Sequence, residues 1–239
     1  MIDTAPSSAQ TLRILLTGAP GAGKGTQAER IAKALDIVTI SSGQLLRTHI
    51  AENTEIGALA KVAVEKGELI SDDIMVSMIQ DEIRRVSGRN WLLDGFPRTV
   101  GQAQLLEQVI AQDPTLESVN LVVNLVVPEE VIIERITERY VHIPSGRTYH
   151  TVYSPPKVAM IDDVTGEPLT KRSDDTVEVV QKRLDTYHKM TRPVLDYYRE
   201  KDIVVDFYGE TSDVIFPQIM DHLAGNFEEA MSKQIEARL

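Results

Sequence analysis

The sequence contains no cysteine among its 239 residues. Disulfide bonds and metal sites built on thiolates are therefore excluded, which is typical of a protein from a reducing compartment. Long apolar runs are missing as well, because none reaches the roughly 18 residues that a membrane-spanning helix needs. From these two absences we expect a globular chain with no membrane partner.

Positive charge is also scarce, since the formal net charge is -11 and the sequence pI is about 5.0. A protein that binds nucleic acid through its backbone phosphates carries the opposite balance, so we expect no nucleic-acid partner. Arginine nevertheless outnumbers lysine. Because arginine suits bidentate phosphate contacts, the composition favours a small phosphorylated ligand held in a cleft.

Short apolar runs alternate with segments of helical periodicity along the chain. This alternation predicts an α/β fold with a parallel sheet that helices cover on both faces. The predicted strands are 13–17, 37–40, 91–94, 121–127 and 203–208. The predicted helices are 24–35, 43–66, 72–87, 99–111, 128–140, 174–200 and 212–224.

Two regions interrupt this alternation. Residues 41–71 are helical and charged and contribute no strand, while 141–173 contain prolines, Gly turns and β-branched residues. A segment of the second kind is uncommon inside a compact domain unless it is functional. We therefore predict that it forms a small inserted β lid.

The stretch "GAPGAGK", from Gly18 to Lys24, directly follows the first predicted strand and precedes a helix. It matches the phosphate-binding loop pattern, in which backbone N–H groups and the positive end of the helix surround phosphate oxygens. Gly25 stands where Ser or Thr usually ligates Mg²⁺, with Thr26 one position later. We therefore expect Mg²⁺ to be held mostly by phosphates and water.

A second strand ends in "WLLDGFPRT", which places Asp94 at the carboxyl edge of the predicted sheet. That edge faces the ligand crevice of a parallel sheet, so the carboxylate could orient the waters of Mg²⁺. Arg98 follows and could clamp a phosphate, and the amide of Gln102 could pair with an adenine edge.

Arginines flank the predicted lid on both sides. Arg135 and Arg139 are four apart on a predicted helix, so they should share one face despite their repulsion. Arg172 lies at the end of the insert and Arg183 lies beyond it. We expect the two pairs to form a phosphate clamp that lid closure completes.

With these motifs in hand, the sequence resembles the adenylate kinase family from about residue 13 to 224. The resemblance rests on "GAPGAGKGTQ", "ISSGQLLR", "LLDGFPRT", "RYVHIPSGRTYH", "DDVTGEPLTKRSDD" and "KRLDTYHK". It implies a P-loop nucleoside monophosphate kinase fold with a five-stranded parallel sheet, an AMP-binding helical insert and a small β lid. The implied divisions are a core of 1–40, 72–137 and 176–239, an AMP-binding insert of 41–71 and a lid of 138–175.

The resemblance also implies the roles of single residues. The catalytic set would be Lys24, Arg98, Arg135, Arg139, Arg172 and Arg183. The donor nucleotide would meet Gly21, Ala22, Gly23, Lys24, Gly25, Thr26, Arg135, Tyr149 and Thr211. AMP would meet Ser42, Gly43, Arg47, Glu68, Ile70, Gly95, Arg98, Gln102, Arg172 and Arg183. Asp94 and Asp175 would orient Mg²⁺ through its waters.

Some members of the family bind zinc in the lid through four cysteines. The corresponding positions here are His142, Ser145, Asp162 and Thr165. Because structural zinc prefers Cys and His ligands, we expect a hydrogen-bonded tetrad and no structural zinc.

The stretch "FYGETSDVIFPQI" resembles the mitochondrial branch of the family, whose preferred donor is GTP. The resemblance is strongest to the fungal members of that branch. The resemblance implies GTP + AMP giving GDP + ADP with Mg²⁺, in a monomer of the mitochondrial matrix. An ATP:AMP phosphotransferase remains the alternative, since the sequence does not show which backbone group near Gly209 to Ser212 faces the donor base. The alternative compartment is the cytoplasm. A P-loop GTPase switch is a remote alternative, because we find no N-K-x-D guanine signature.

Overall fold

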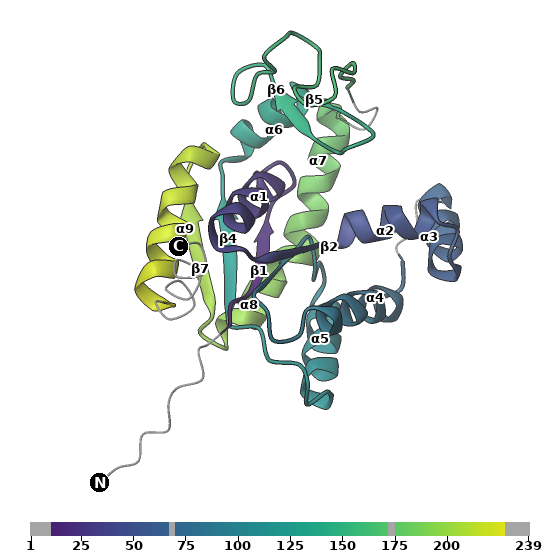
Figure 1. Cartoon of the computed structure of the whole chain (residues 1–239), viewed down its shortest axis with the longest axis vertical. Coiled ribbons are helices and arrows are strands. Elements are labelled where there is room, and N and C mark those ends of the chain that lie inside the picture. The colour runs from purple at the N-terminus through teal and green to yellow at the C-terminus, as the bar shows by residue number, and fades with distance from the viewer. Residues whose placement is uncertain (1–10, 67–69, 172–174, 228–239) are drawn as a thin grey trace.

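The computed structural model describes residues 11–66, 70–171 and 175–227. At its centre lies a five-stranded parallel sheet with the strand order β2-β3-β1-β4-β7 (Figure 1). The strands are β1 (Arg13–Gly18), β2 (Val38–Ser41), β3 (Trp91–Asp94), β4 (Leu121–Val126) and β7 (Val204–Tyr208). Each lies within a residue or so of a predicted strand, and the predicted fold class is confirmed.

Successive residues of β1 enter different cores, as the two-residue period of a strand requires. Ile14 and Leu16 belong to one apolar cluster, whereas Leu15 belongs to the other. Helices α1 (Lys24–Leu35), α6 (Glu129–Thr137), α7 (Val177–Thr186) and α9 (Ser212–Asn226) supply the first cluster. Helices α4 (Asp72–Arg85), α5 (Val100–Gln112) and α8 (Arg192–Arg199) supply the second. The sheet is therefore buried on both faces, which explains its nearly continuous apolar strands.

The segment predicted as one helix over 43–66 is in fact two helices, and that prediction was wrong. α2 (Ser42–Ala51) and α3 (Glu55–Lys66) are separated by a turn in which Asn53 has a φ of 51°. The two helices cross closely, because a Cβ on Gly57 would come within 1.9 Å of the carbonyl oxygen of His49. The helical period runs through both segments, so periodicity alone does not reveal the turn.

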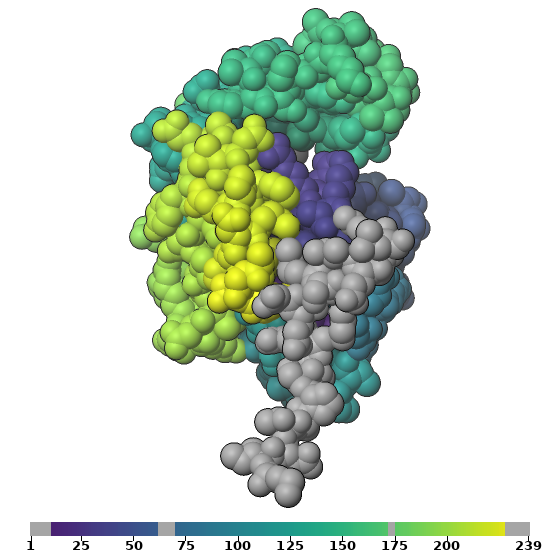
Figure 2. Space-filling view, turned by 60° about the vertical axis from the view of Figure 1, so that its left-hand side comes forward, coloured from purple at the N-terminus to yellow at the C-terminus, as the bar shows by residue number. Residues whose placement is uncertain are grey.

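A second correction concerns the start of the lid segment. The predicted helix 128–140 ends at Thr137, and residues Arg139–Val141 form strand β5, which pairs antiparallel with β6 (Thr148–His150). Arg135 and Arg139 therefore do not share a helix face. The small β structure predicted for the insert is present, and Figure 2 shows it overhanging the purple N-terminal part of the chain with a hollow beneath it.

The run predicted as one helix over 174–200 contains α7, a π-helical turn (Tyr187–Thr191) and α8. In Figure 1, α2 and α3 project to one side of the sheet and the lid segment lies above it. The division into core, AMP-binding insert and lid stays a prediction. Across the described ranges, no helix is both long and apolar enough to cross a membrane.

Candidate nucleotide-binding site

The predicted phosphate-binding loop joins the central strand β1 directly to α1. Gly23 is the N-cap of α1 with a φ of 90°, a left-handed conformation that favours glycine. A Cβ at this position would also lie 3.1 Å from the hydroxyl oxygen of Ser212, at the start of α9. The loop therefore opens an α-helix N-terminus at the carboxyl edge of the sheet, which is where anions bind.

Lys24 turns back over this loop. Its ammonium donates to the carbonyl oxygens of Gly18 at 2.7 Å and Ala19 at 2.9 Å. Burial lowers the pKa of Lys24 to about 8, and the nearby Asp94 carboxylate opposes that shift. The side chain is therefore held at the loop that it is predicted to assist.

Asp94 and Arg98 lie next to Lys24. Burial raises the pKa of the Asp94 carboxyl, while Lys24 and Arg98 act to lower it. Burial lowers the pKa of the Arg98 guanidinium, with Asp94 opposing. Within the part of the chain that the structure describes, no protein donor is bonded to the Asp94 carboxylate, so its oxygens remain available for water or for the waters of a metal ion.

The predicted AMP side of the site is built around Gly95. The Ser42 hydroxyl donates to the Gly95 carbonyl oxygen at 2.9 Å, and Nε of Arg98 donates to the same oxygen at 2.8 Å. The amide of Gln102 is also engaged, since Oε1 accepts from the Arg98 backbone at 2.7 Å and Nε2 donates to Asp72 at 2.8 Å. The structure therefore brings Ser42, Gly95, Arg98 and Gln102 together, and their contact with AMP stays a prediction.

Other predicted AMP contacts lie further out. Arg47 is exposed on α2 and donates to the side chain of Gln44 at 2.9 Å. Gly43 lies on the same helix, and a Cβ there would meet Arg47 at 3.4 Å. Ile70 is partly buried just before α4. Glu68 falls outside the described residues.

The arginine cluster at the lid boundary is organised by a buried carboxylate. Arg139 on β5 makes a bidentate ion pair with Asp175, at 2.9 and 2.6 Å. Arg183 on α7 lies 3.9 Å from the same carboxylate. The structure therefore joins Arg139 to Arg183 through Asp175, whereas the predicted pairing of Arg139 with Arg135 on one helix face is not present. Arg172 lies outside the described residues.

Arg135 lies apart from this pair, on α6, which precedes the lid segment. Its guanidinium stands over the ring of Tyr153, 4.9 Å from the centroid, and donates to the carbonyl oxygen of Glu210. Burial lowers the pKa of the guanidinium, and Nε has no partner among the described residues. Arg135 thus connects α6, the lid and the loop before α9, where Thr211 caps that helix.

Two of these residues carry no clear sequence signal. Tyr153 pairs with Arg135, and Gln27 binds the first residue of α9, Ser212, yet neither was expected at the site. The aromatic residue lies in a proline-rich lid stretch, and the glutamine reads as an ordinary helical position. Tyr149, which was expected near the donor nucleotide, donates its hydroxyl to Asp162 inside the lid at 2.9 Å.

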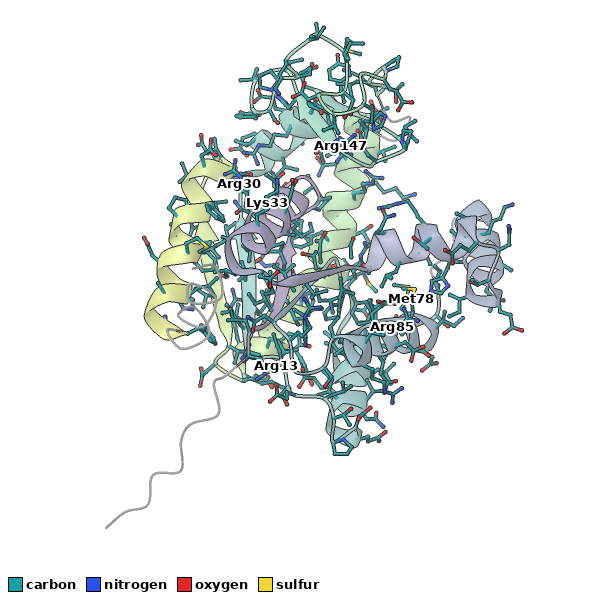
Figure 3. All side chains as sticks on the ribbon, viewed as in Figure 1. Arg13, Arg30, Lys33, Met78, Arg85 and Arg147 are labelled. Carbon is teal, nitrogen blue, oxygen red and sulfur yellow. The ribbon has the colours of Figure 1, made fainter. Side chains whose placement is uncertain are left out.

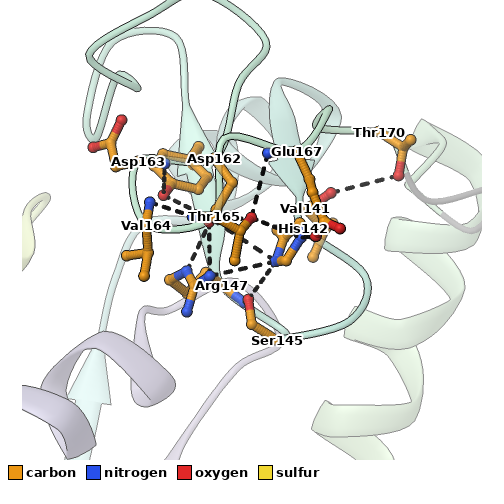
Figure 4. A network of polar contacts seen from close by, with 11 residues as sticks. Val141, His142, Ser145, Arg147, Asp162, Asp163, Val164, Thr165, Glu167 and Thr170 are labelled. Carbon is orange, nitrogen blue, oxygen red and sulfur yellow. Dashed lines mark hydrogen bonds and ion pairs between the residues drawn. The ribbon is translucent and has the colours of Figure 1, made fainter.

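The lid is held by a polar network around Asp162 (Figures 3 and 4). Arg147 binds this carboxylate through Nε at 2.8 Å and through a terminal nitrogen at 2.7 Å. The hydroxyl of Thr165 donates to Asp162 at 3.0 Å, and Ser145 lies 2.6 Å from Nδ1 of His142. The predicted hydrogen-bonded tetrad is present. The absence of structural zinc stays a prediction, and elemental analysis of the purified protein should find less than stoichiometric zinc.

Asp162→Asn should lower the thermal stability of the lid, because it removes the charge that Arg147 and the loop N–H groups bind. Arg147 holds the pKa of the Asp162 carboxyl well below its usual range. The carboxylate is therefore stabilising above the ordinary Asp value of 3.8, and that contribution is lost as pH falls below it.

Denaturation of wild type and variant between pH 3 and 7 checks this prediction. The difference in the free energy of unfolding between the two proteins should be largest above about pH 5 and should shrink on acidification. Asp163→Asn is the matched control, since Asp163 accepts one backbone hydrogen bond from Lys157, at 2.8 Å. A difference that grew toward low pH would contradict the assignment.

The parallel sheet begins with a strand, a glycine loop and a helix. A lysine lies over the loop, and arginines lie along the same edge of the sheet. This arrangement defines a P-loop nucleotide-binding protein. The family model for adenylate kinase matches residues 16–203. The chain belongs to the adenylate kinase family.

Three relatives illustrate its place in the family. The chain is 47% identical to "GTP:AMP phosphotransferase, mitochondrial" of Saccharomyces cerevisiae over 221 residues, covering 90% of this chain and 94% of that protein. It is 44% identical to "Adenylate kinase 4" of Oryza sativa subsp. japonica, covering 85% of this chain and 84% of that protein. It is 46% identical to "Adenylate kinase" of Laccaria bicolor, covering 83% of this chain and 77% of that protein.

Proposed function

We propose that the protein is a phosphotransferase that moves the terminal phosphoryl group of GTP, with ATP as the alternative donor, reversibly to AMP. The observation that carries the proposal is the position of Lys24, Asp94 and Arg98 at one sheet edge, between the phosphate loop and the Ser42–Gly95 contact. Two polyanions that met there would have cationic groups between them. The names of the yeast and rice relatives support the same reaction.

The attacking group would be a phosphate oxygen of AMP. Its second pKa is about 6, so it is ionised at neutral pH and needs no general base. The task left to the protein is to align the two phosphate groups and to stabilise the charge of the transition state. Lys24, Arg98 and the arginines near the lid supply fixed positive charge for this purpose.

Mg²⁺ is expected to accompany the donor nucleotide and to neutralise part of its phosphate charge. Asp94 fits a role in orienting the waters of the ion, because its carboxylate lies at the sheet edge without a protein hydrogen bond among the described residues. Asp175 fits that role less well, since Arg139 already binds both of its oxygens. We therefore propose Asp94 as the principal residue that faces the hydrated ion.

The remaining arginines would complete the site from the lid side. Arg139 and Arg183 already converge on Asp175, which places two guanidinium groups at the boundary between the lid and α7. Arg135 would approach the donor from α6. Closure of the lid over the hollow in Figure 2 would exclude water, which otherwise competes for the transferred phosphoryl group.

The pH dependence of donor use should follow the ionisation of Lys24. Its pKa is lowered to about 8 in the nucleotide-free protein, so the ammonium loses its proton as pH rises through that value. Phosphate binds the charged form, and kcat/KM for the donor should therefore lie near its plateau at pH 7, be about half of it at pH 8 and fall toward tenfold per pH unit above that.

Initial rates at varied donor and saturating AMP between pH 7 and 9.5 check this expectation. Measurements at varied AMP and saturating donor serve as the control, because bound phosphate keeps Lys24 charged and the decline should move to higher pH. A donor profile that rose above pH 8 would contradict the role of Lys24.

The donor and acceptor nucleotide profile tests the proposed function as a whole. GTP and ATP would each be combined with AMP, CMP, UMP and GMP, and products resolved by chromatography. We expect turnover with AMP alone among the acceptors and a higher kcat/KM for GTP than for ATP. A strong ATP preference would favour the ordinary ATP:AMP phosphotransferase, and hydrolysis of GTP without an acceptor would favour a GTPase.

The proposed compartment is the mitochondrion, because the yeast relative carries that word in its name. A location in the matrix and a monomeric state are finer proposals. Fractionation of the organelle and light scattering of the purified chain would test them.

A further inference from the structure

Gln27 is a buried polar residue whose hydrogen bonding serves a neighbouring segment. Its side chain is fully buried on α1, three residues beyond Lys24, and Nε2 donates to the backbone carbonyl oxygen of Ser212 at 3.0 Å. Its other amide atom, Oε1, is buried without a partner in the part of the chain described. A methionine would fill similar space without stranding an acceptor, so packing alone does not explain a glutamine here.

The segment that Gln27 holds lies directly beside the phosphate loop. A Cβ on Gly23 would come within 3.1 Å of the Ser212 hydroxyl oxygen. One helical turn beyond Gln27, Arg30 forms an ion pair with Asp213 at 2.6 Å, and Figure 3 shows Arg30 on α1 beside α9. The start of α9 is therefore fixed to the helix that carries the phosphate loop.

Two other side chains hold carbonyl groups of the same segment. Nε2 of Gln218, on α9, donates to the carbonyl oxygen of Tyr208 at 2.9 Å. Arg135, on α6, donates to that of Glu210. With Gln27, donors from three separate helices thus occupy the carbonyl oxygens of alternate residues along 208–212.

The backbone N–H groups of this segment differ from its carbonyl oxygens in their hydrogen bonding. Among the described residues, the backbone N–H groups of Glu210 and Thr211 make no hydrogen bond to another backbone group. Guanine presents an oxo acceptor at position 6, whereas adenine presents an amino donor there. The carbonyl oxygens of Tyr208, Glu210 and Ser212 are thus occupied by side-chain donors, whereas the N–H groups of Glu210 and Thr211 are open. Open N–H groups suit the oxo group better.

We propose that Gln27 and Gln218 are positioning residues that set the preference for a 6-oxopurine donor. They occupy backbone carbonyl oxygens that would otherwise accept the amino group of adenine, and they orient the segment 208–212 so that its N–H groups face the base. This inference rests on the proposed function, because it assigns the donor base to this segment.

The test uses Gln27→Met, Gln27→Glu and Gln218→Met in the full chain, with Gln108→Met on the exposed face of α5 as the matched control. The measured quantities are kcat/KM for GTP, ITP and ATP, KM for AMP, and the melting temperature. We expect the GTP to ATP ratio to fall about tenfold, through KM of the donor, with ITP following GTP. KM for AMP should not change, and Gln27→Met should melt at the wild-type temperature or above it.

The outcomes separate this inference from the proposed function. Wild-type ratios in all three variants would overturn the inference and leave the proposed function standing. A parallel loss with both donors and with AMP, together with a lower melting temperature, would assign Gln27 and Gln218 a structural role only. If GTP, ITP and ATP all failed to support AMP phosphorylation by the wild-type protein, the proposed function and this inference would both be refuted.

Discussion

Lys24→Met should lower kcat by about 10³-fold or more and leave the protein folded. A loss of that size corresponds to about 4 kcal/mol of transition-state stabilisation. It is expected because the Lys24 ammonium lies over the phosphate loop, where it contacts the Gly18 and Ala19 carbonyl oxygens. A charge fixed in a partly enclosed site is worth more to a phosphoryl transition state than one exposed to water.

The fold should tolerate this substitution. Burial lowers the pKa of Lys24, which means that the folded state holds the charged side chain less favourably than water does. Methionine removes that cost, so the melting temperature should stay the same or rise. Lys33→Met is the control on the same helix (Figure 3), because Lys33 is exposed and pairs with Glu29. Near-normal turnover by folded Lys24→Met would remove this residue from the mechanism.

Arg98→Met should lower kcat/KM for AMP by about 10²- to 10³-fold. The guanidinium is held at the AMP side by the Gly95 carbonyl oxygen, and it lies close enough to Asp94 for the two to shift each other's pKa. Removing one oriented donor from a developing oxyanion typically costs a factor of this size. KM for the donor should change by much less, because the phosphate loop and Lys24 remain.

Steady-state kinetics with each substrate varied in turn checks this split. Arg85→Met is the matched control, since Arg85 is exposed at the end of α4 (Figure 3) and pairs with Glu82. If AMP and donor parameters fell together, Arg98 would act on the whole site rather than on the acceptor. If neither changed, the assignment of the AMP side to Ser42, Gly95 and Arg98 would be wrong.

Much of the core could be predicted because its signals are local. Each strand of the sheet is a short apolar run bounded by turn residues, and the glycine loop follows β1 without a gap. The carboxyl ends of parallel strands meet at one edge, so the sequence also placed Asp94 near Lys24. Their coupled pKa shifts agree with that placement.

The errors arose where a local pattern continued through a change in structure. Helical periodicity extends across Asn53, yet the chain turns there and α3 folds back against α2. The spacing of Arg135 and Arg139 suits a helix, yet α6 ends between them because Arg139–Val141 pair with β6. In both cases a tertiary contact decides the outcome, and a single sequence does not report such contacts.

Side-chain contacts between distant segments were also not predicted from the sequence. Gln27 and Ser212 are 185 residues apart, and Arg135 reaches Glu210 across 75 residues. The Asp175 carboxylate was expected to face Mg²⁺ but binds Arg139. Sequence spacing identifies which residues carry charge, whereas the fold determines which of them neutralise one another.

The central claim is that one chain holds a donor nucleotide and AMP together, end to end, between the phosphate loop and the Arg98 segment. Calorimetric titration of AMP into protein saturated with a non-hydrolysable GTP analogue tests it most directly. We predict one AMP and one donor per chain, and we predict that a dinucleoside polyphosphate long enough to span both sites displaces them together. Binding of only one nucleotide per chain, with AMP and the donor analogue excluding each other, would contradict the account.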